Sequence, residues 1–131
     1  KPVRVLNDAG LQGLGAIGGH GTEIVITLGT GMGFALYVDG HYVPNVELAH
    51  HPFSKKRTYE ENVGNRARKR LGKRKWESQV RKVLAQIQKT FNPDKIYVGG
   101  GNAAKYSGKL PDGVVKIDNI AGLLGGIALW R

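Results

Sequence analysis

Cysteine is absent from this chain of 131 residues, acidic residues are scarce, and long apolar runs do not occur. Without cysteine there is no disulfide framework and no zinc site built on thiolates. No segment approaches the roughly 20 consecutive apolar residues of a membrane-spanning helix. The lack of cysteine fits a reducing compartment, so we expect a cytoplasmic protein with no membrane partner.

Positive charge is what the chain has in excess. Twenty Lys and Arg residues accompany ten Asp and Glu, which gives a formal net charge of +10. This balance predicts an acidic or polyanionic partner but says nothing about the fold. The length suits one domain with a sizeable core. Because Lys1 precedes what resembles the middle of a strand, we expect a fragment of a longer protein.

The chain is organised around residues 28–33, where Gly29, Gly31 and Gly33 occupy alternate positions. The flanking runs 22–27 and 34–38 are rich in β-branched and aromatic residues and predict strands. Glycines can take positive φ angles and have no Cβ in the way, so backbone N–H groups can approach a phosphate closely. A P-loop and a dinucleotide fingerprint are both excluded, because neither Gly-Lys-Ser/Thr nor a helix follows. A purely structural glycine-rich hairpin is the alternative.

The remaining pattern alternates between strands and helices. Expected strands are 3–6, 22–29, 33–38, 41–43, 95–98 and 114–117, with Asp39-Gly40 as a two-residue hairpin turn. Expected helices are 9–16, 59–71, 76–91 and 120–130, with a short helical stretch at 103–106. This order predicts an α/β domain with a mixed sheet flanked by helices.

Residues 55–89 hold thirteen of the twenty Lys and Arg residues and three Glu. One interpretation is an ordinary solvated helix face, and the other is a surface for a polyanion. Few aromatic residues interleave with these cations, so nucleic acid is the less favoured polyanion. His50 and His51 have Glu47 as the nearby acid, which is too little for a metal site.

Four segments occur in a suggestive order: Val5-Leu6-Asn7-Asp8-Ala9, Leu28 to Gly33, Pro44 to His50, and Val98 to Gly101. Together they resemble motifs of the ROK sugar kinases (repressors, open reading frames and kinases), and within that family the polyphosphate glucokinases. The resemblance implies the ribonuclease-H-like, actin-like ATPase fold. It also implies that residues 1–131 form a single domain, the C-terminal lobe of a two-lobed kinase whose N-terminal lobe is missing.

The same resemblance implies transfer of a phosphoryl group from polyphosphate or ATP to the 6-hydroxyl of glucose. Local pattern alone leaves Asp8 open between a helix N-cap and a catalytic carboxylate, and the resemblance favours the catalytic base. The implied sugar ligands are Asn7, Glu47, His50 and Glu60. The implied phosphate ligands are Gly29, Thr30, Gly31 and Gly33, with Gly99, Gly100 and Gly101 binding the far end of the donor.

The resemblance further implies a homodimer and Mg²⁺ held mainly by the donor and the missing lobe, without structural zinc. The family's first phosphate motif, Asp-x-Gly-Gly-Thr, does not occur, so we expect this chain alone to be inactive. Ala49 replaces a usual glycine of the sugar-binding loop. The alternatives are a non-catalytic ROK-type regulator or basic polyanion-binding module, and a kinase for another hexose or an amino sugar.

Overall fold

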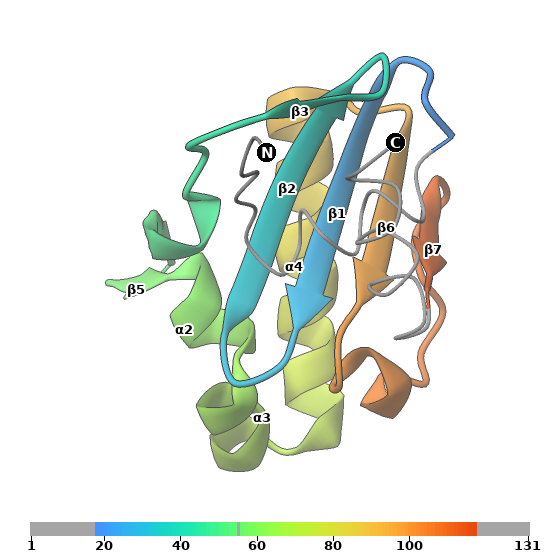
Figure 1. Cartoon of the computed structure of the whole chain (residues 1–131). Coiled ribbons are helices and arrows are strands. Elements are labelled where there is room, and N and C mark those ends of the chain that lie inside the picture. Colours follow the sequence, from blue (N-terminus) through green and yellow to red (C-terminus); the bar gives the residue numbers. More distant parts are fainter. Residues whose placement is uncertain (1–17, 55, 118–131) are drawn as a thin grey trace, which may run out of the picture.

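A mixed five-stranded sheet forms the centre of the computed structural model, which describes residues 18–54 and 56–117 (Figure 1). The strands of this sheet are β1 (Thr22–Leu28), β2 (Met32–Val38), β3 (His41–Val43), β6 (Lys95–Gly99) and β7 (Val114–Lys116), in the order β3-β2-β1-β6-β7. β1 pairs antiparallel with β2 and parallel with β6, while β2–β3 is antiparallel and β6–β7 parallel. The predicted mixed sheet is confirmed.

The strand predictions for 22–29, 33–38, 41–43, 95–98 and 114–117 are confirmed to within one residue. At the predicted hairpin turn, Asp39 and Gly40 both have positive φ, 49° and 81°, as a two-residue turn of this kind requires. The predicted strand 3–6 and the predicted helices 9–16 and 120–130 lie outside the described residues. Asn7 and Asp8 lie there too.

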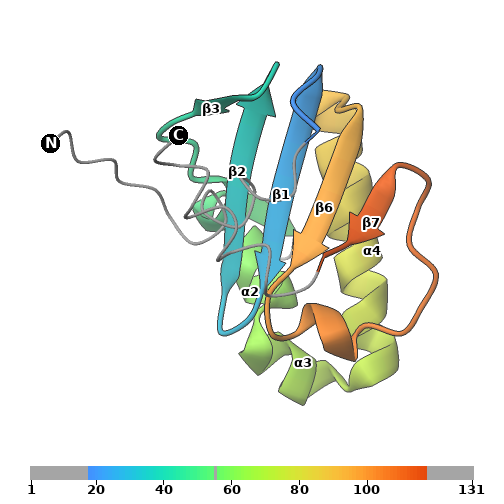
Figure 2. The same cartoon turned by 45° about the vertical axis from the view of Figure 1, so that its right-hand side comes forward.

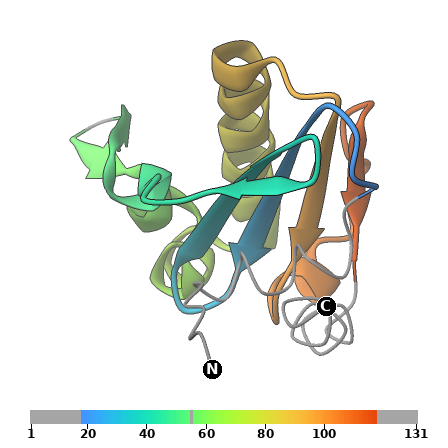
Figure 3. The same cartoon turned by 45° about the horizontal axis from the view of Figure 1, so that its top comes forward.

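Helix α4 (Lys73–Phe91) runs across one face of the sheet, and α2 (Tyr59–Val63) and α3 (Asn65–Leu71) lie near the end of the sheet at which β1 turns into β2 (Figure 2, Figure 3). Two short 3₁₀ helices, η1 (Leu48–His50) and η2 (Ala103–Lys105), and a small sheet of β4 (Pro52–Ser54) and β5 (Arg57–Thr58) complete the described elements. In the described part of the chain, no helix combines the length and apolar character that crossing a membrane would require.

The prediction of one helix over residues 59–71 is wrong. Gly64 is extended, with φ −68° and ψ 177°, and it separates α2 from α3. A Cβ at Gly64 would lie 2.8 Å from the carbonyl oxygen of Thr30, so the close approach of the chain to the β1–β2 turn requires glycine here. The helix expected at 76–91 begins earlier, at Lys73, and Gly72 alone separates it from α3. The helical stretch expected at 103–106 is the single 3₁₀ turn of η2.

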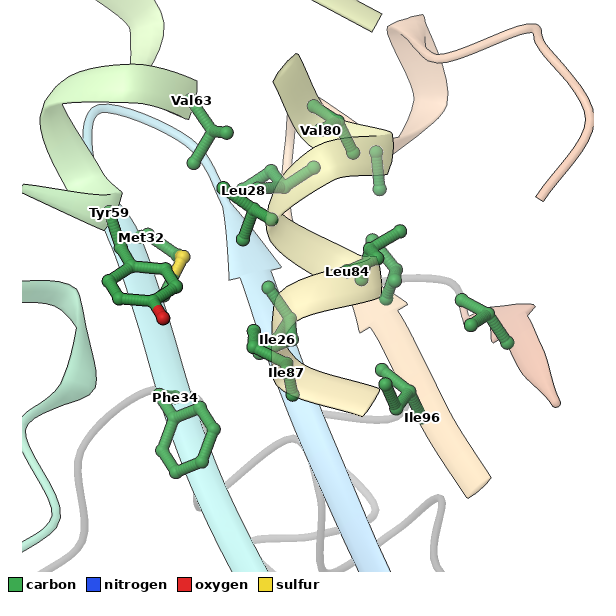
Figure 4. Packing of buried hydrophobic residues seen from close by; sticks show 14 of the residues in the cluster. Ile26, Leu28, Met32, Phe34, Tyr59, Val63, Val80, Leu84, Ile87 and Ile96 are labelled. Carbon is green, nitrogen blue, oxygen red and sulfur yellow. The ribbon is translucent and has the colours of Figure 1, made fainter. Parts of the chain in front are cut away.

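The core lies between α4 and the sheet (Figure 4). Trp76, Val80, Val83, Leu84 and Ile87 recur at helical spacing and are all buried, and Phe91, which continues the same face, is partly buried. They meet a layer of strand residues that comprises Ile24, Ile26, Leu28, Phe34, Ile96 and Val98. Burying one such side chain contributes about 1.5–3 kcal/mol relative to leaving it exposed, so this contact dominates the stability of the described part.

The opposite face of the sheet is also apolar, with Val25, Ala35, Tyr37 and Tyr97 in one buried cluster. Beside this cluster, Glu23 is only 3% exposed. Its carboxylate accepts hydrogen bonds from Gly18 N–H (2.7 Å), Gly19 N–H (2.9 Å) and the Tyr97 hydroxyl (2.8 Å). Burial alone would raise the pKa of Glu23, but these hydrogen bonds outweigh it and leave the pKa below the ordinary value. Burial and the bond to Glu23 raise the pKa of Tyr97 to about 12.

Glu23→Gln tests this buried carboxylate. The variant keeps the shape but gives up the charge that three donors stabilise, so we expect a loss of about 1–3 kcal/mol in the free energy of unfolding at pH 7. A carboxyl with a lowered folded-state pKa stabilises the protein above its unfolded pKa, near 4.5, and loses that contribution as pH falls through the folded value. The difference between parent and variant, measured by urea unfolding, should therefore shrink below about pH 4.5. The exposed Glu47→Gln is the control, and a difference that does not change with pH would contradict this role.

Candidate functional site

A cavity of about 510 Å³ opens at the carboxyl ends of the parallel strands β1 and β6. The turn from β1 into β2 lies at this end of the sheet (Figure 1). Segments far apart in the sequence line the cavity: the hairpin 27–34, the loop 46–50, Glu60 of α2, and Gly100-Gly101. It brings together nine of the predicted site residues: Gly29, Thr30, Gly31, Gly33, Glu47, His50, Glu60, Gly100 and Gly101. Gly99 does not line the cavity, because it is buried in the last position of β6.

The hairpin turn has its carbonyl groups bound from outside the turn. Leu28 O accepts a hydrogen bond from the Asn102 N–H (2.9 Å), and Gly29 O accepts one from Asn102 Nδ2 (3.1 Å). Thr30 O accepts a bond from the N–H of Asn65, the first residue of α3 (3.1 Å). Three successive carbonyls are thus held by the protein.

The amide groups of the same turn are bound differently. Gly29 N–H donates to Gly31 O (3.0 Å), whereas the N–H groups of Thr30 and Gly31 have no acceptor among the described residues. The N–H groups of Gly100 and Gly101 are likewise without an acceptor in residues 18–54 and 56–117. Such donors at the wall of a cavity suit an anion with several acceptor oxygens.

The cavity glycines differ in what their lack of a side chain does. At Gly100, with φ 90°, a Cβ would lie 2.5 Å from Leu28 O, so the fold itself requires glycine. At Gly29 and Gly101, a Cβ would meet no described atom within 4 Å, and neither residue has positive φ. Neither conformation nor contacts within the described part require glycine there. Their bare backbone leaves room for a ligand beside the unbound N–H groups.

Gly31 has a different reason for being glycine from the one the sequence suggests. Gly29, Gly31 and Gly33 do not use the positive φ open to glycine, so an explanation through backbone conformation is wrong for this turn. A Cβ on Gly31 would lie 1.8 Å from Glu60 Oε1, which accepts the Met32 N–H at 3.1 Å. Gly31 therefore makes room for a carboxylate that fixes the start of β2.

Glu60 lies between the hairpin and the loop 46–50. While Glu60 Oε1 binds the hairpin, Oε2 lies 3.9 Å from Nδ1 of His50. A capping box sets the start of α2: Thr58 Oγ1 accepts from the Glu61 N–H, and the Glu61 carboxylate accepts from the Thr58 N–H. That cap fixes the helix turn that carries Glu60.

The loop 46–50 contributes polar groups to the lining of the cavity. Glu47 precedes η1, and its carbonyl oxygen accepts the His50 N–H at 3.3 Å. Ala49, at the position for which the family resemblance implies glycine, is 5% exposed and packs into the core. Its methyl group is thus accommodated in the 3₁₀ turn. Within the described ranges, no three His, Asp or Glu side chains are grouped so that they could hold a metal ion.

Asn65 and Asn102 are the site residues that the sequence did not reveal. Asn102 is 5% exposed, and its Nδ2 lies 3.4 Å from Asn65 Oδ1 in addition to its bond to Gly29 O. Arg68 Nη2 donates to the same Asn65 oxygen at 3.0 Å. The one sequence signal was the position of Asn102 directly after three glycines, where a polar side chain follows a strand end.

Known proteins resemble this chain in sequence and in structure. No protein-family model matches the chain. It is 29% identical over 139 residues to the polyphosphate glucokinases of Mycobacterium leprae and Mycobacterium tuberculosis, which covers 95% of this chain and 43% and 52% of those proteins. The inorganic polyphosphate/ATP-glucomannokinase of Arthrobacter sp. strain KM matches with a TM-score of 0.82 and 32% identity, over 99% of this chain and 58% of that one. The chain is a relative of the polyphosphate glucokinases.

The predicted fold is confirmed as well. A ROK family glucokinase from Streptomyces griseus, in complex with glucose and AMPPNP, matches with a TM-score of 0.68 and 19% identity, over 98% of this chain and 68% of that one. At this identity the match shows the fold alone: the chain has the fold of the ROK sugar kinases, which is the actin-like ATPase fold. The chain spans about half the length of the curated relatives it matches.

Asn102→Ala tests the hydrogen bonds behind the hairpin. It removes the side-chain donor to Gly29 O and one of the two donors to Asn65 Oδ1, which Arg68 still binds, so we expect a loss of about 0.5–1.5 kcal/mol in the free energy of unfolding. We also expect weaker binding of tripolyphosphate to the cavity, measured by calorimetry, because the turn is then less fixed. Gln86→Ala, at an exposed position of α4, is the control. Unchanged stability together with unchanged tripolyphosphate binding would show that the Asn102 amide does not position the turn.

Proposed function

We propose that this chain is the C-terminal lobe of a two-lobed sugar kinase that transfers a phosphoryl group from polyphosphate or ATP to the 6-hydroxyl of glucose. One observation carries the proposal: the same cavity is lined by backbone N–H groups that have no acceptor among the described residues and by the polar side chains of Glu47, His50 and Glu60. Phosphate oxygens need the donors, and sugar hydroxyls need the carboxylates and the imidazole. The identity to polyphosphate glucokinases and to a polyphosphate/ATP-glucomannokinase supports these two ligand classes.

Phosphoryl transfer depends chiefly on positioning and on stabilising negative charge, and little covalent chemistry is left to the protein. In our proposal the N–H groups of Thr30 and Gly31 donate hydrogen bonds to the oxygens of the transferred phosphoryl group. The N–H groups of Gly100 and Gly101 bind the phosphate donor at a point further from that group. Glu47, His50 and Glu60 orient the sugar so that its 6-hydroxyl faces that group. Asp8, outside the described residues, is the proposed base beside Asn7, and it accepts the hydroxyl proton.

A divalent cation, when bound, would neutralise charge on the donor phosphates. The described residues do not fit it, because Glu60 binds the hairpin through one oxygen and no group of three ligands is present among them. We therefore assign no step to Mg²⁺ on this chain and propose that the donor and the opposing lobe hold it. The inactivity of the chain alone, the homodimer and the cytoplasmic location stay predictions.

A pair of glycine substitutions in the full-length enzyme tests whether the hairpin turn binds the phosphate donor. Gly29→Ala places a methyl group where no described atom lies within 4 Å, so the stability should not change. The methyl group occupies space proposed for the phosphate donor, so the Michaelis constant of that donor should rise about tenfold. The Michaelis constant of glucose should stay the same. Gly31→Ala is the matched contrast. Its Cβ meets Glu60, so the Michaelis constants of both the phosphate donor and glucose should rise and the stability should fall. If Gly29→Ala instead affects glucose alone, the turn belongs to the sugar site and the proposal fails.

Asp8→Asn in the full-length enzyme tests the proposed base. A general base contributes about 10²- to 10⁴-fold to the rate, so turnover should fall by that factor. Glucose affinity should stay nearly the same, because the amide still accepts a hydrogen bond. Turnover within a few-fold of the parent, measured in a coupled assay, would remove Asp8 from the mechanism and leave it as a helix cap.

A further inference from the structure

A second cavity, of about 340 Å³, lies beside the junction of α3 and α4. It is lined by Arg68, Lys73, Trp76, Ala104, Lys105 and Ser107, and we call it the cationic pocket. Three of these side chains carry positive charge at neutral pH. The β1–β2 turn, α3, the start of α4 and η2 gather at the same end of the molecule, so the cationic pocket lies at the end that holds the first cavity (Figure 1).

Arg68 has a buried donor without a partner. Its Nη2 donates to Asn65, but its buried Nε has no acceptor among the described residues. Buried polar groups of proteins are nearly always hydrogen-bonded, and an unsatisfied donor on a charged group is especially unfavourable. The guanidinium of Arg68 is thus partly desolvated and held in place by Asn65 where it lines the cationic pocket.

The start of α4 points to an anion independently. Its N-cap, Gly72, has no side chain to receive the first N–H groups, and the first turn carries Lys73, Arg74 and Lys75 with no acid. The N-terminus of a helix bears partial positive charge and favours anions, so three cations there disfavour the folded state unless an anion is bound. None of the first three N–H groups of α4 has an acceptor among the described residues.

Among the described residues, Glu77 is the acid that binds a lining residue of the cationic pocket, and its carboxylate is already hydrogen-bonded. Glu77 Oε2 accepts the Ser107 N–H at 2.7 Å and the Ser107 hydroxyl at 3.3 Å. Its single negative charge cannot balance Arg68, Lys73, Lys105 and the helix end together. The cationic pocket therefore keeps a surplus of positive charge and of free donors, which is the environment that a phosphate group requires.

The two cavities are joined by hydrogen bonds and by sequence. Arg68 binds Asn65, which bonds to Asn102, which in turn binds Gly29 of the hairpin. Along the chain, Gly101 lines the first cavity, and Ala104 and Lys105 line the cationic pocket. We propose that the cationic pocket binds phosphate groups of a polyphosphate donor that lie beyond the group being transferred. This inference rests on the proposed function, because it takes the hairpin cavity as the place of transfer.

Binding of sodium tripolyphosphate and of long-chain polyphosphate to the 131-residue chain, measured by calorimetry at low salt, tests the proposal. Lys73→Gln with Lys105→Gln removes two exposed cations of the pocket. Affinity for long-chain polyphosphate should fall about tenfold, and the slope of log affinity against log salt should decrease by about two contacts. Tripolyphosphate, which fills the hairpin cavity, should change by less than about twofold.

The matched control is Lys89→Gln with Lys95→Gln, which removes equal charge at exposed positions at the far ends of α4 and β6. It should change the affinity for either ligand by less than about twofold. Equal weakening by both double variants would overturn the proposal in favour of net charge alone, and no weakening by either would also overturn it. A DNA duplex of matched charge that binds more tightly than polyphosphate would overturn it in favour of nucleic acid.

The hairpin variant separates this inference from the proposed function. Gly29→Ala in the same titrations should weaken tripolyphosphate as well as long-chain polyphosphate. If Gly29→Ala changes neither ligand while the Lys73 and Lys105 pair weakens the long chain, the cationic pocket stands as an anion site and the transfer site in the hairpin fails. If Gly29→Ala weakens both ligands and the lysine pair changes nothing, the hairpin assignment stands and the cationic pocket fails.

Discussion

The candidate site depends on the way the protein holds three carbonyl oxygens from behind. Leu28 O, Gly29 O and Thr30 O are bound by Asn102 and by the N–H of Asn65. A turn between two strands would otherwise leave its carbonyls free to rotate towards the cavity, where they would repel an anion. Because the carbonyls are fixed, the neighbouring N–H groups are already aligned before any ligand arrives. Donors prepared in this way stabilise developing charge without reorganisation at the moment of reaction.

The hydrogen bonds that Asn65 and Asn102 donate to the turn carbonyls depend in turn on the packing of α4. Trp76 is fully buried and donates from Nε1 to the carbonyl oxygen of Val63, the last residue of α2 (2.8 Å). This bond fixes the end of α2, and the extended Gly64 then sets where α3 begins. Asn65, at the first position of α3, reaches Thr30 only from there. The packing of α4 against the sheet therefore positions the N–H of Asn65 at the site.

The sequence predicted the sheet because its signals are local. β-branched alternation and the Asp39-Gly40 turn sit within the strands they specify, and the apolar face of α4 repeats every three or four residues. The break at Gly64 has no comparable signal, since it lies where the chain passes a distant hairpin and the N–H of Asn65 donates to Thr30 O. Gly31 likewise looks like a residue chosen for its backbone freedom, whereas its reason is the carboxylate of Glu60. Partners that are remote in sequence were out of reach of such patterns.

The same distinction applies to charge. In the sequence the thirteen cations of residues 55–89 form one basic stretch, but the structure divides them. Arg68 holds Asn65 and borders the cationic pocket together with Lys73, whereas Lys82 and Lys89 border a different hollow beside Phe53, further along α4. A flexible, solvated lysine gains little from an anion, because water screens the attraction and ordering the side chain costs entropy. A partly buried guanidinium next to an uncapped helix start is already desolvated and fixed. The net charge of +10 can attract a polyanion to this protein. Only cations that are partly buried and fixed, as Arg68 is, can determine where on the protein surface its phosphates bind.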